Sequence, residues 1–334
     1  MVNISSIRKS NKQVDESSAP RVAVFVGGTA GIGKITLAKI ADLGIGFKAY
    51  VIGRKGSEQS FKSFLEELHQ ANPNANVIWI EGEVSLLSEA KRVCDYIKTL
   101  ESTVDLLFMT TGYAPFGGRD NTSEGLDVSH SLSFYSRICF VENLLSHLRA
   151  SGRARVISVL GGGIESARAL DINDLNLENP GAFGAIVTQR HMLIMGTLTL
   201  ERLAERKENH SIVFIHSYPG IVRTGNLFRG WGEGSWGPWM AAIFMDPILM
   251  LFAFSFDESA ERHLYQATSG AFGGRGPTIP GIVGQTTRGE HVGGLFLVNQ
   301  RCDTVMNEKE LAKLRQTAQE AVWTKAHQIV NPYI

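Results

Sequence analysis

A glycine-rich turn near the start of the chain has the residue types and spacing to bind a phosphate group. Residues 27–34 read Gly-Gly-Thr-Ala-Gly-Ile-Gly-Lys and directly follow the apolar run 22–26. The glycines allow a tight turn and let the backbone approach a pyrophosphate, whose charge is met by the first N–H groups of a helix. The turn therefore predicts a dinucleotide site with contacts from Gly27, Thr29, Gly31, Ile32 and Gly33.

The same turn also fits the first part of a nucleoside-triphosphate loop, GxxxxGK, over residues 28–34. That loop requires a Ser or Thr at the next position to hold magnesium. Ile35 stands there instead, and Thr36 comes one residue late. The residues therefore disfavour a triphosphate site without excluding it.

Two cations follow the second apolar run, 49–52, in the order Gly53-Arg54-Lys55. A site for NAD would carry an acid here to hold the ribose 2′-hydroxyl. Arg54 can instead form a fork of hydrogen bonds to a 2′-phosphate, and Lys55 adds a point charge. We therefore expect NADP(H) as the cofactor. The alternative interpretation is an ordinary exposed Arg-Lys pair.

The elements that must position these residues alternate along the chain. Short apolar runs predict strands at 22–26, 49–52, 77–80, 106–109, 155–159 and 212–216, with helices between them. This alternation predicts an α/β fold, a Rossmann-like, doubly wound parallel sheet with helices on both faces. We expect a polar extension over 1–20, a dinucleotide-binding part over 21–224, and a C-terminal cap with further elements of the same domain over 225–334.

Composition narrows the partners and the compartment. The 334 residues carry 33 basic and 33 acidic side chains, so charge gives no basis for binding nucleic acid. The polar first residues and the three distant cysteines predict a cytoplasmic protein. The apolar segment 236–256 has Asp246-Pro247 in its middle, which argues against a membrane span and leaves a lid-like helical pair or plain core.

Further motifs follow the later strands in a fixed order. Glu83-Val84 comes after the third strand, Thr110-Thr111-Gly112 after the fourth, and Pro219 to Thr224 after the sixth, while Ser158 ends the fifth. With the glycine turn, these motifs resemble the short-chain dehydrogenase/reductase family from about residue 22 to residue 224. The pattern is similar to divergent members of that family in fungal secondary metabolism.

The resemblance implies a role for each motif. Glu83 and Val84 would border the adenine, and Thr111 and Gly112 would form part of the cofactor site. Pro219, Gly220, Val222 and Thr224 would clasp the nicotinamide, with Thr224 on its carboxamide. Ser158 would hydrogen-bond a substrate carbonyl, and the helices after the fourth and fifth strands would pair subunits into a homodimer or homotetramer.

The proton donor of that family is absent. The family uses a tyrosine with a lysine four residues later, and none of the seven tyrosines has this partner. The expected helix instead offers Phe183 and Val187 in one register, or Ile186 and Arg190 in another. The candidates for the missing groups are Tyr113 and His191 as acids and Arg190 as a cation near the ribose, with His216 and Tyr218 on the same sheet edge.

Three functions therefore compete. The first is an NADPH-dependent reductase of a carbonyl on a hydrophobic small molecule, whose apolar site would include Trp231, Trp236 and Trp239. The second is a non-redox isomerase or cyclase that uses the cofactor cleft as a binding pocket. The third is a catalytically silent NADP-binding protein. The sequence has no spacing typical of metal ligands.

Overall fold

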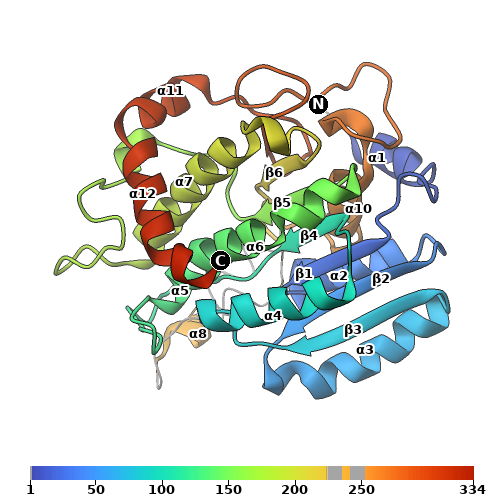
Figure 1. The fold of residues 1–334 in the computed structure, drawn as a ribbon, viewed down its shortest axis with the longest axis horizontal. Helices are drawn as coiled ribbons and strands as arrows, with labels where there is room; N and C mark the ends of the chain where they lie inside the picture. Colours follow the sequence, from blue (N-terminus) through green and yellow to red (C-terminus); the bar gives the residue numbers. More distant parts are fainter. Residues whose placement is uncertain (1, 223, 225–234, 241–252) are drawn as a thin grey trace.

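The centre of the molecule is a parallel sheet. The computed structural model describes residues 2–222, 224, 235–240 and 253–334. Seven strands lie in the order β3-β2-β1-β4-β5-β6-β7 (Figure 1). They are β1 (Val22–Val26), β2 (Phe47–Gly53), β3 (Ala75–Glu81), β4 (Leu106–Met109), β5 (Arg155–Val159), β6 (Val213–Ser217) and β7 (Leu295–Val298). The predicted Rossmann-like fold is confirmed, and the order reverses between β1 and β4, where such sheets bind ligands.

The central strands are apolar on both sides because helices cover both faces of the sheet. One face carries α4 (Leu87–Leu100), α6 (Ser136–Ser151) and α7 (Ala185–Ala204), packed on side chains such as Val24, Leu107 and Val156. The other face carries α2 (Gly31–Ala41), α3 (Glu58–Ala71) and α10 (Phe256–Thr268). Strand residues therefore alternate between two separate cores.

The helix after β4 is interrupted by a π-helical turn. It begins as α5 (Val128–His130), passes through the turn η2 (Ser131–Tyr135) and continues as α6. Such turns change the direction of side chains and often mark functional sites. Short 3-10 turns occur at η1 (Lys55–Ser57), η3 (Ala167–Ala169), η4 (Lys207–Asn209), η7 (Gly270–Phe272) and η8 (Asn331–Tyr333).

The last third of the chain contributes one strand to the sheet and several helices that pack around it. It supplies β7, α10, α11 (Glu308–Thr317) and α12 (Gln319–Val330). The predicted polar extension contains a helix, α1 (Ile4–Asn11), that packs on α10 (Figure 1). Asn11 Nδ2 donates to the backbone oxygen of Glu261 at 2.8 Å and to its Oε2 at 2.6 Å, so the N-terminal segment is tied to the C-terminal part.

Helix α12 covers the outer sides of α6 and α7. Val322, Ala326 and Val330 are fully buried in the same core as these two helices, and α12 runs across them in Figure 1. His327 Nε2 also lies 3.0 Å from Glu142 Oε1 on α6. The helices to which the family resemblance assigns subunit pairing are therefore packed against α12 of the same chain.

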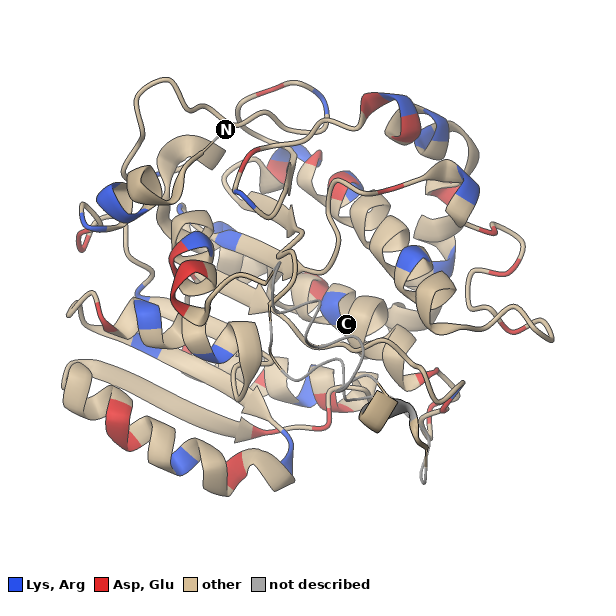
Figure 2. Cartoon of the chain, turned by 180° about the vertical axis from the view of Figure 1, so that it is seen from behind, with Lys and Arg blue, Asp and Glu red and all other residues tan. Residues whose placement is uncertain are grey.

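Acidic and basic residues are mixed over the surface helices, including α3, as the red and blue segments of Figure 2 show. In the part of the chain that the structure describes, no helix is both long and apolar enough to cross a bilayer. Residues 241–252 of the apolar segment and Trp231 lie outside the described residues.

Candidate active site

The glycine turn joins β1 to α2 and leaves no room for side chains. Gly27 has φ +99° and Gly31 has φ +59°, in the left-handed region that favours glycine. A Cβ on Gly33 would lie 2.2 Å from the carbonyl oxygen of Gly27. Ala30 gives α2 no side-chain cap, so the first N–H groups of the helix are left for another acceptor. The turn therefore fits an anionic pyrophosphate.

The segment after β6 lies against this turn. A Cβ on Gly31 would be 3.1 Å from the Cβ of Thr224, and the backbone N–H of Thr224 donates to the oxygen of Val222 at 2.7 Å. Gly220, at φ +69°, packs against Gln300 and Phe254. The structure thus brings Thr224, the last residue of the predicted nicotinamide loop, to the glycine turn.

The end of β2 forms the opposite side of the predicted cofactor site. A Cβ on Gly53 would lie 2.5 Å from Thr29 Cγ2 and 2.7 Å from Trp79 Nε1. The Trp79 indole N–H is buried without a hydrogen-bond partner among the described residues. Arg54 and Lys55, directly after Gly53, are exposed. Two exposed cations at this strand end fit a phosphorylated group.

Glu83 and Val84, which follow β3 after Gly82, lie in different surroundings. Glu83 is exposed, and its Oε1 accepts a hydrogen bond of 2.8 Å from the Ser85 hydroxyl. Val84 is buried in the core below it. Ser85 thus holds the exposed Glu83 carboxylate in place, while Val84 packs in the core beneath it.

Ser158 lies at the carboxyl end of β5 and is only 4% exposed. Its Oγ accepts a hydrogen bond of 2.7 Å from Nη1 of Arg137, a residue of α6. The same guanidinium donates to the backbone oxygens of Val159, at 3.0 Å, and Thr111. Burial lowers the pKa of Arg137 to about 9. Among the described residues, its partners are a hydroxyl and carbonyl oxygens and include no carboxylate.

These contacts connect the glycine turn to Ser158. The Thr110 hydroxyl donates to the Gly27 oxygen at 2.8 Å, and the next residue, Thr111, accepts from Arg137, which binds Ser158. Gly112 then approaches the π-helical turn, since a Cβ there would meet Ser133 Oγ at 2.7 Å. The predicted cofactor turn and the predicted catalytic serine are therefore connected by a continuous run of contacts.

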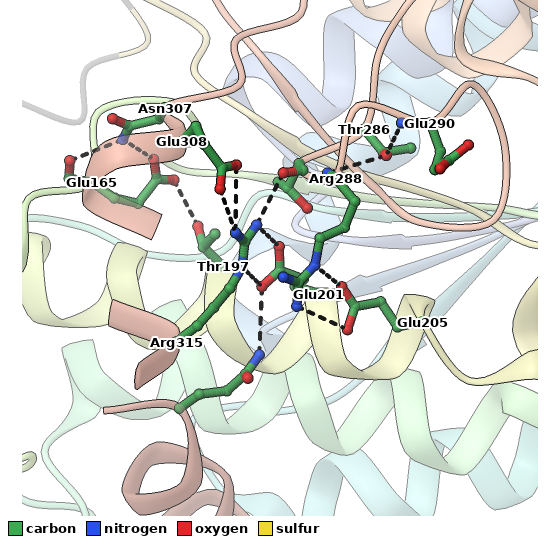
Figure 3. A network of polar contacts seen from close by, with 12 residues as sticks. Glu165, Thr197, Glu201, Glu205, Thr286, Arg288, Glu290, Asn307, Glu308 and Arg315 are labelled. Atoms are coloured by element: carbon green, nitrogen blue, oxygen red, sulfur yellow. Dashed lines mark hydrogen bonds and ion pairs between the residues drawn. The ribbon is translucent and has the colours of Figure 1, made fainter. Parts of the chain in front are cut away.

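A second polar network lies behind Ser158, on β6 and α7. His216 is the cross-strand neighbour of Ser158, and its Nδ1 is 2.7 Å from the Thr197 hydroxyl. Thr197 donates to Glu165 Oε1 at 2.7 Å, and Asn307 Nδ2 donates to Glu165 Oε2 at 2.9 Å (Figure 3). Since Thr197 donates to Glu165, its oxygen accepts from His216 Nδ1, which leaves Nε2 to accept from the Gly161 N–H at 3.4 Å.

This burial changes the chemistry of His216. Desolvation, followed by the charge of Arg137, lowers the pKa of His216 to about 3. The imidazole is therefore neutral near pH 7 and positions the loop after β5. It does not fit the role of a general acid that the sequence suggested.

The predicted proton donors lie in different surroundings. Tyr113 is half-buried after β4, its backbone oxygen accepts from Gln189 Nε2 at 2.9 Å, and burial raises its pKa, so the phenol keeps its proton. His191 is buried on α7, and its Nε2 accepts from the Asp171 N–H at 3.2 Å. Burial lowers the pKa of His191, which disfavours the protonated form. Arg190 is exposed on the same helix.

Arg137 is the site residue that sequence reasoning missed. It lies four positions after Ser133 in a helix whose neighbouring residues Phe134, Tyr135 and Ile138 are all buried. A charged residue among such neighbours is a signal, because an arginine is rarely fully buried without a specific role.

Exposed apolar side chains surround the carboxyl edge of the sheet. They come from the segments that leave this edge: Phe116 after β4, Ile164 after β5, Ile186 and Val187 at the start of α7, and Trp236 and Trp239. Trp239 lies in the short helix α8 (Gly237–Met240), and the two tryptophan rings meet edge to face at 6.2 Å. Exposed apolar side chains that contact one another, as these two tryptophans do, can mark a binding site.

The strand order, the glycine turn at the start of α2 and the buried serine at the end of β5 are features of a dinucleotide-binding oxidoreductase. Comparison with known proteins identifies the family within this class. The chain is 36% identical to the NmrA-like family domain-containing oxidoreductase notO of an Aspergillus species, over 97% of this chain and 93% of that protein. The chain belongs to the short-chain dehydrogenase/reductase family.

Other comparisons agree with this family. The short-chain dehydrogenase/reductase SAT2 of Stachybotrys chartarum is 28% identical over 91% of this chain and 89% of its own length. The solved structure of YwfH, an NADPH dependent reductase involved in bacilysin biosynthesis, shares the fold with a TM-score of 0.55 at 19% identity, covering 78% of this chain and 95% of that chain. No protein-family model matches the sequence.

Proposed function

We propose that the chain is an NADP(H)-dependent reductase that acts on a carbonyl group of a hydrophobic small molecule in secondary-metabolite biosynthesis. The observation that carries this proposal is the run of contacts from Gly27 through Thr110, Thr111 and Arg137 to Ser158. These contacts link a serine at the end of β5, through Arg137 and the segment after β4, to a turn suited to a dinucleotide, which supports the proposal. The fungal relatives named as oxidoreductases support it, and a reducing cytoplasm suits its three buried free cysteines.

When bound, NADPH supplies a hydride to the carbonyl carbon. The chain's own residues must then hold the carbonyl oxygen and give it a proton. Ser158 binds that oxygen, and Tyr113 is the proposed proton donor because it is a neutral phenol on the adjoining strand end. The apolar side chains around the sheet edge would hold the rest of a greasy substrate.

Cofactor choice tests the first half of the proposal. We expect Arg54→Ala to weaken NADPH binding by more than about tenfold, about 1.4 kcal/mol, and to leave NADH binding nearly unchanged, because only NADPH carries the 2′-phosphate. Isothermal titration with both cofactors measures this. The control is Lys62→Ala, which removes an exposed cation of α3 that pairs with Glu58. Equal losses for NADPH and NADH in the Arg54 variant would refute the assignment.

Product mass tests the second half. A reductase consumes NADPH and adds two hydrogens to a hydrophobic ketone, whereas an isomerase or cyclase leaves both the mass and NADPH unchanged. The isomerase is the second candidate, because Ser158 and the nearby cation would also stabilise the charged oxygen of an enolate. Tight NADPH binding without turnover of any substrate in a broad panel would favour the silent binding protein.

A further inference from the structure

We infer that the Arg137 guanidinium takes over the electrostatic part of what the missing tyrosine and lysine would supply, while Tyr113 remains the proposed proton donor: Arg137 holds Ser158 as a hydrogen-bond donor and stabilises negative charge on a substrate oxygen bound there. Arg137 is a positioning residue in this proposal, since it acts through Ser158. The inference rests on the proposed function, because it assumes that the substrate oxygen binds at Ser158.

The direction of the Ser158 hydroxyl follows from its partner. A guanidinium can only donate, so Ser158 Oγ must accept the 2.7 Å hydrogen bond from Arg137 Nη1. Among the hydrogen bonds of the described residues, Ser158 donates to none. Its O–H therefore stays free to donate to an incoming oxygen, while Arg137 occupies one of the two acceptor positions of Oγ.

The guanidinium is held rigidly in place. Nη1 also donates to Val159 at the end of β5, Nη2 donates to Thr111 after β4, and Nε lies 3.3 Å from the oxygen of Leu132 in the π-helical turn. Three backbone segments therefore fix its position before any ligand binds. Preorganised donors of this kind stabilise charge that develops during a reaction without a cost of reorganisation.

The positive charge is not cancelled nearby. Arg137 is fully buried, and in the described structure its direct contacts include no carboxylate. The buried carboxylate of Glu165 instead accepts hydrogen bonds from Thr197, Asn307 and the Gly163 N–H, and no hydrogen bond or ion pair between it and Arg137 occurs among the described residues. Since burial weakens the screening of charge, a cation at this depth favours an anion at the Ser158 hydroxyl.

A chromophoric probe tests this without knowledge of the substrate. 4-Nitrophenol absorbs at different wavelengths as phenol and as phenolate, so its spectrum reports the charge of the bound form. It is titrated into the full-length protein saturated with NADP⁺, across pH values near the probe's own pKa. We expect bound probe to ionise at least about one pH unit lower than free probe, and Arg137→Met to abolish this shift.

Three further variants separate charge from folding. Arg137→Lys keeps the charge and should keep part of the shift, whereas Ser158→Ala should lose most of it. Arg155→Met removes another fully buried arginine, which binds backbone oxygens of the 266–275 segment from the same strand, and should leave the shift intact in the folded protein. An unchanged shift in folded Arg137→Met, or no phenolate binding by the unaltered protein, overturns the inference.

Kinetics then distinguishes this inference from the proposed function. With a ketone that the enzyme reduces, Arg137→Met should lower kcat by about 10²-fold or more and change KM little. Reduction that persists at full rate in this variant would remove Arg137 and leave the reductase proposal standing. A normal phenolate shift without reduction of any ketone would instead remove the reductase and leave the charged site standing.

Discussion

Ser158 and Arg137 come from two consecutive elements, the end of strand β5 and the helix α6 that precedes it. At this scale the proposed site consists of one hydroxyl, one buried cation and the half-buried phenol of Tyr113. His216 and His191 are neutral supports for neighbouring loops, because burial favours the uncharged imidazole in both.

Removal of the Ser158 hydroxyl should reduce turnover and preserve the fold. We expect Ser158→Ala to lower kcat about 10²-fold, in the range for loss of one preorganised donor, with an unchanged thermal midpoint. The matched control is Ser217→Ala, which removes a buried hydroxyl at the end of the next strand. If Ser158→Ala is fully active, or if Ser217→Ala is equally damaged, Ser158 has no special role.

The sequence predicted Ser158 and missed Arg137 for a physical reason. A serine at the end of a buried strand can be placed from the strand pattern alone, because parallel strands direct their carboxyl ends to one edge. The position of Arg137 depends on the π-helical turn just before it, and the sequence pattern gives no sign of that turn. The pKa values of His216 and His191 likewise depend on burial that only the folded chain reveals.

At the scale of the elements, the β1–α2 connection is the least tolerant part of the site. Gly33→Ala should weaken NADPH binding by at least about tenfold, about 1.4 kcal/mol, because the added Cβ would collide with the Gly27 oxygen at 2.2 Å and move the turn. Gly46→Ala is the control, since its Cβ would meet only Asn74, at 3.6 Å. Titration of both variants with NADPH, with circular dichroism for folding, checks this.

Full NADPH affinity in the Gly33 variant would show that the turn does not approach the pyrophosphate.

The six strands predicted from apolar runs all occur in the structure, because strands buried on both faces leave continuous apolar runs. The seventh, β7, has only four residues, in a glycine-rich stretch, and was not predicted. Helices α1, α10, α11 and α12 were also missed.

At the scale of the whole molecule, the C-terminal helices are fixed by a buried ion pair. Arg315 of α11 donates through Nη2 to Glu201 Oε1 at 2.7 Å and through Nε to Glu201 Oε2 at 3.0 Å (Figure 3). Glu201 of α7 is fully buried. The network that contains this pair extends to Thr286, Arg288 and Glu205, so it joins three distant parts of the chain.

Loss of this pair should destabilise the whole fold. Arg315→Met leaves the Glu201 carboxylate buried without its cation, and we expect the free energy of unfolding to fall by about 3–5 kcal/mol. Urea denaturation measures this. Lys62→Met, which removes an exposed i,i+4 pair with Glu58, should change it by less than about 1 kcal/mol. Similar values for the two variants would show that the buried pair does not hold the C-terminal helices.

The position of α12 has a consequence for how the protein responds to dilution. Where two copies of a chain bury each other's apolar helices, unfolding is coupled to dissociation, and the melting temperature rises with protein concentration. Here Val322, Ala326 and Val330 bury the outer sides of α6 and α7 within a single chain. That contribution to stability is intramolecular, so it persists at the low abundance at which a paired enzyme would come apart.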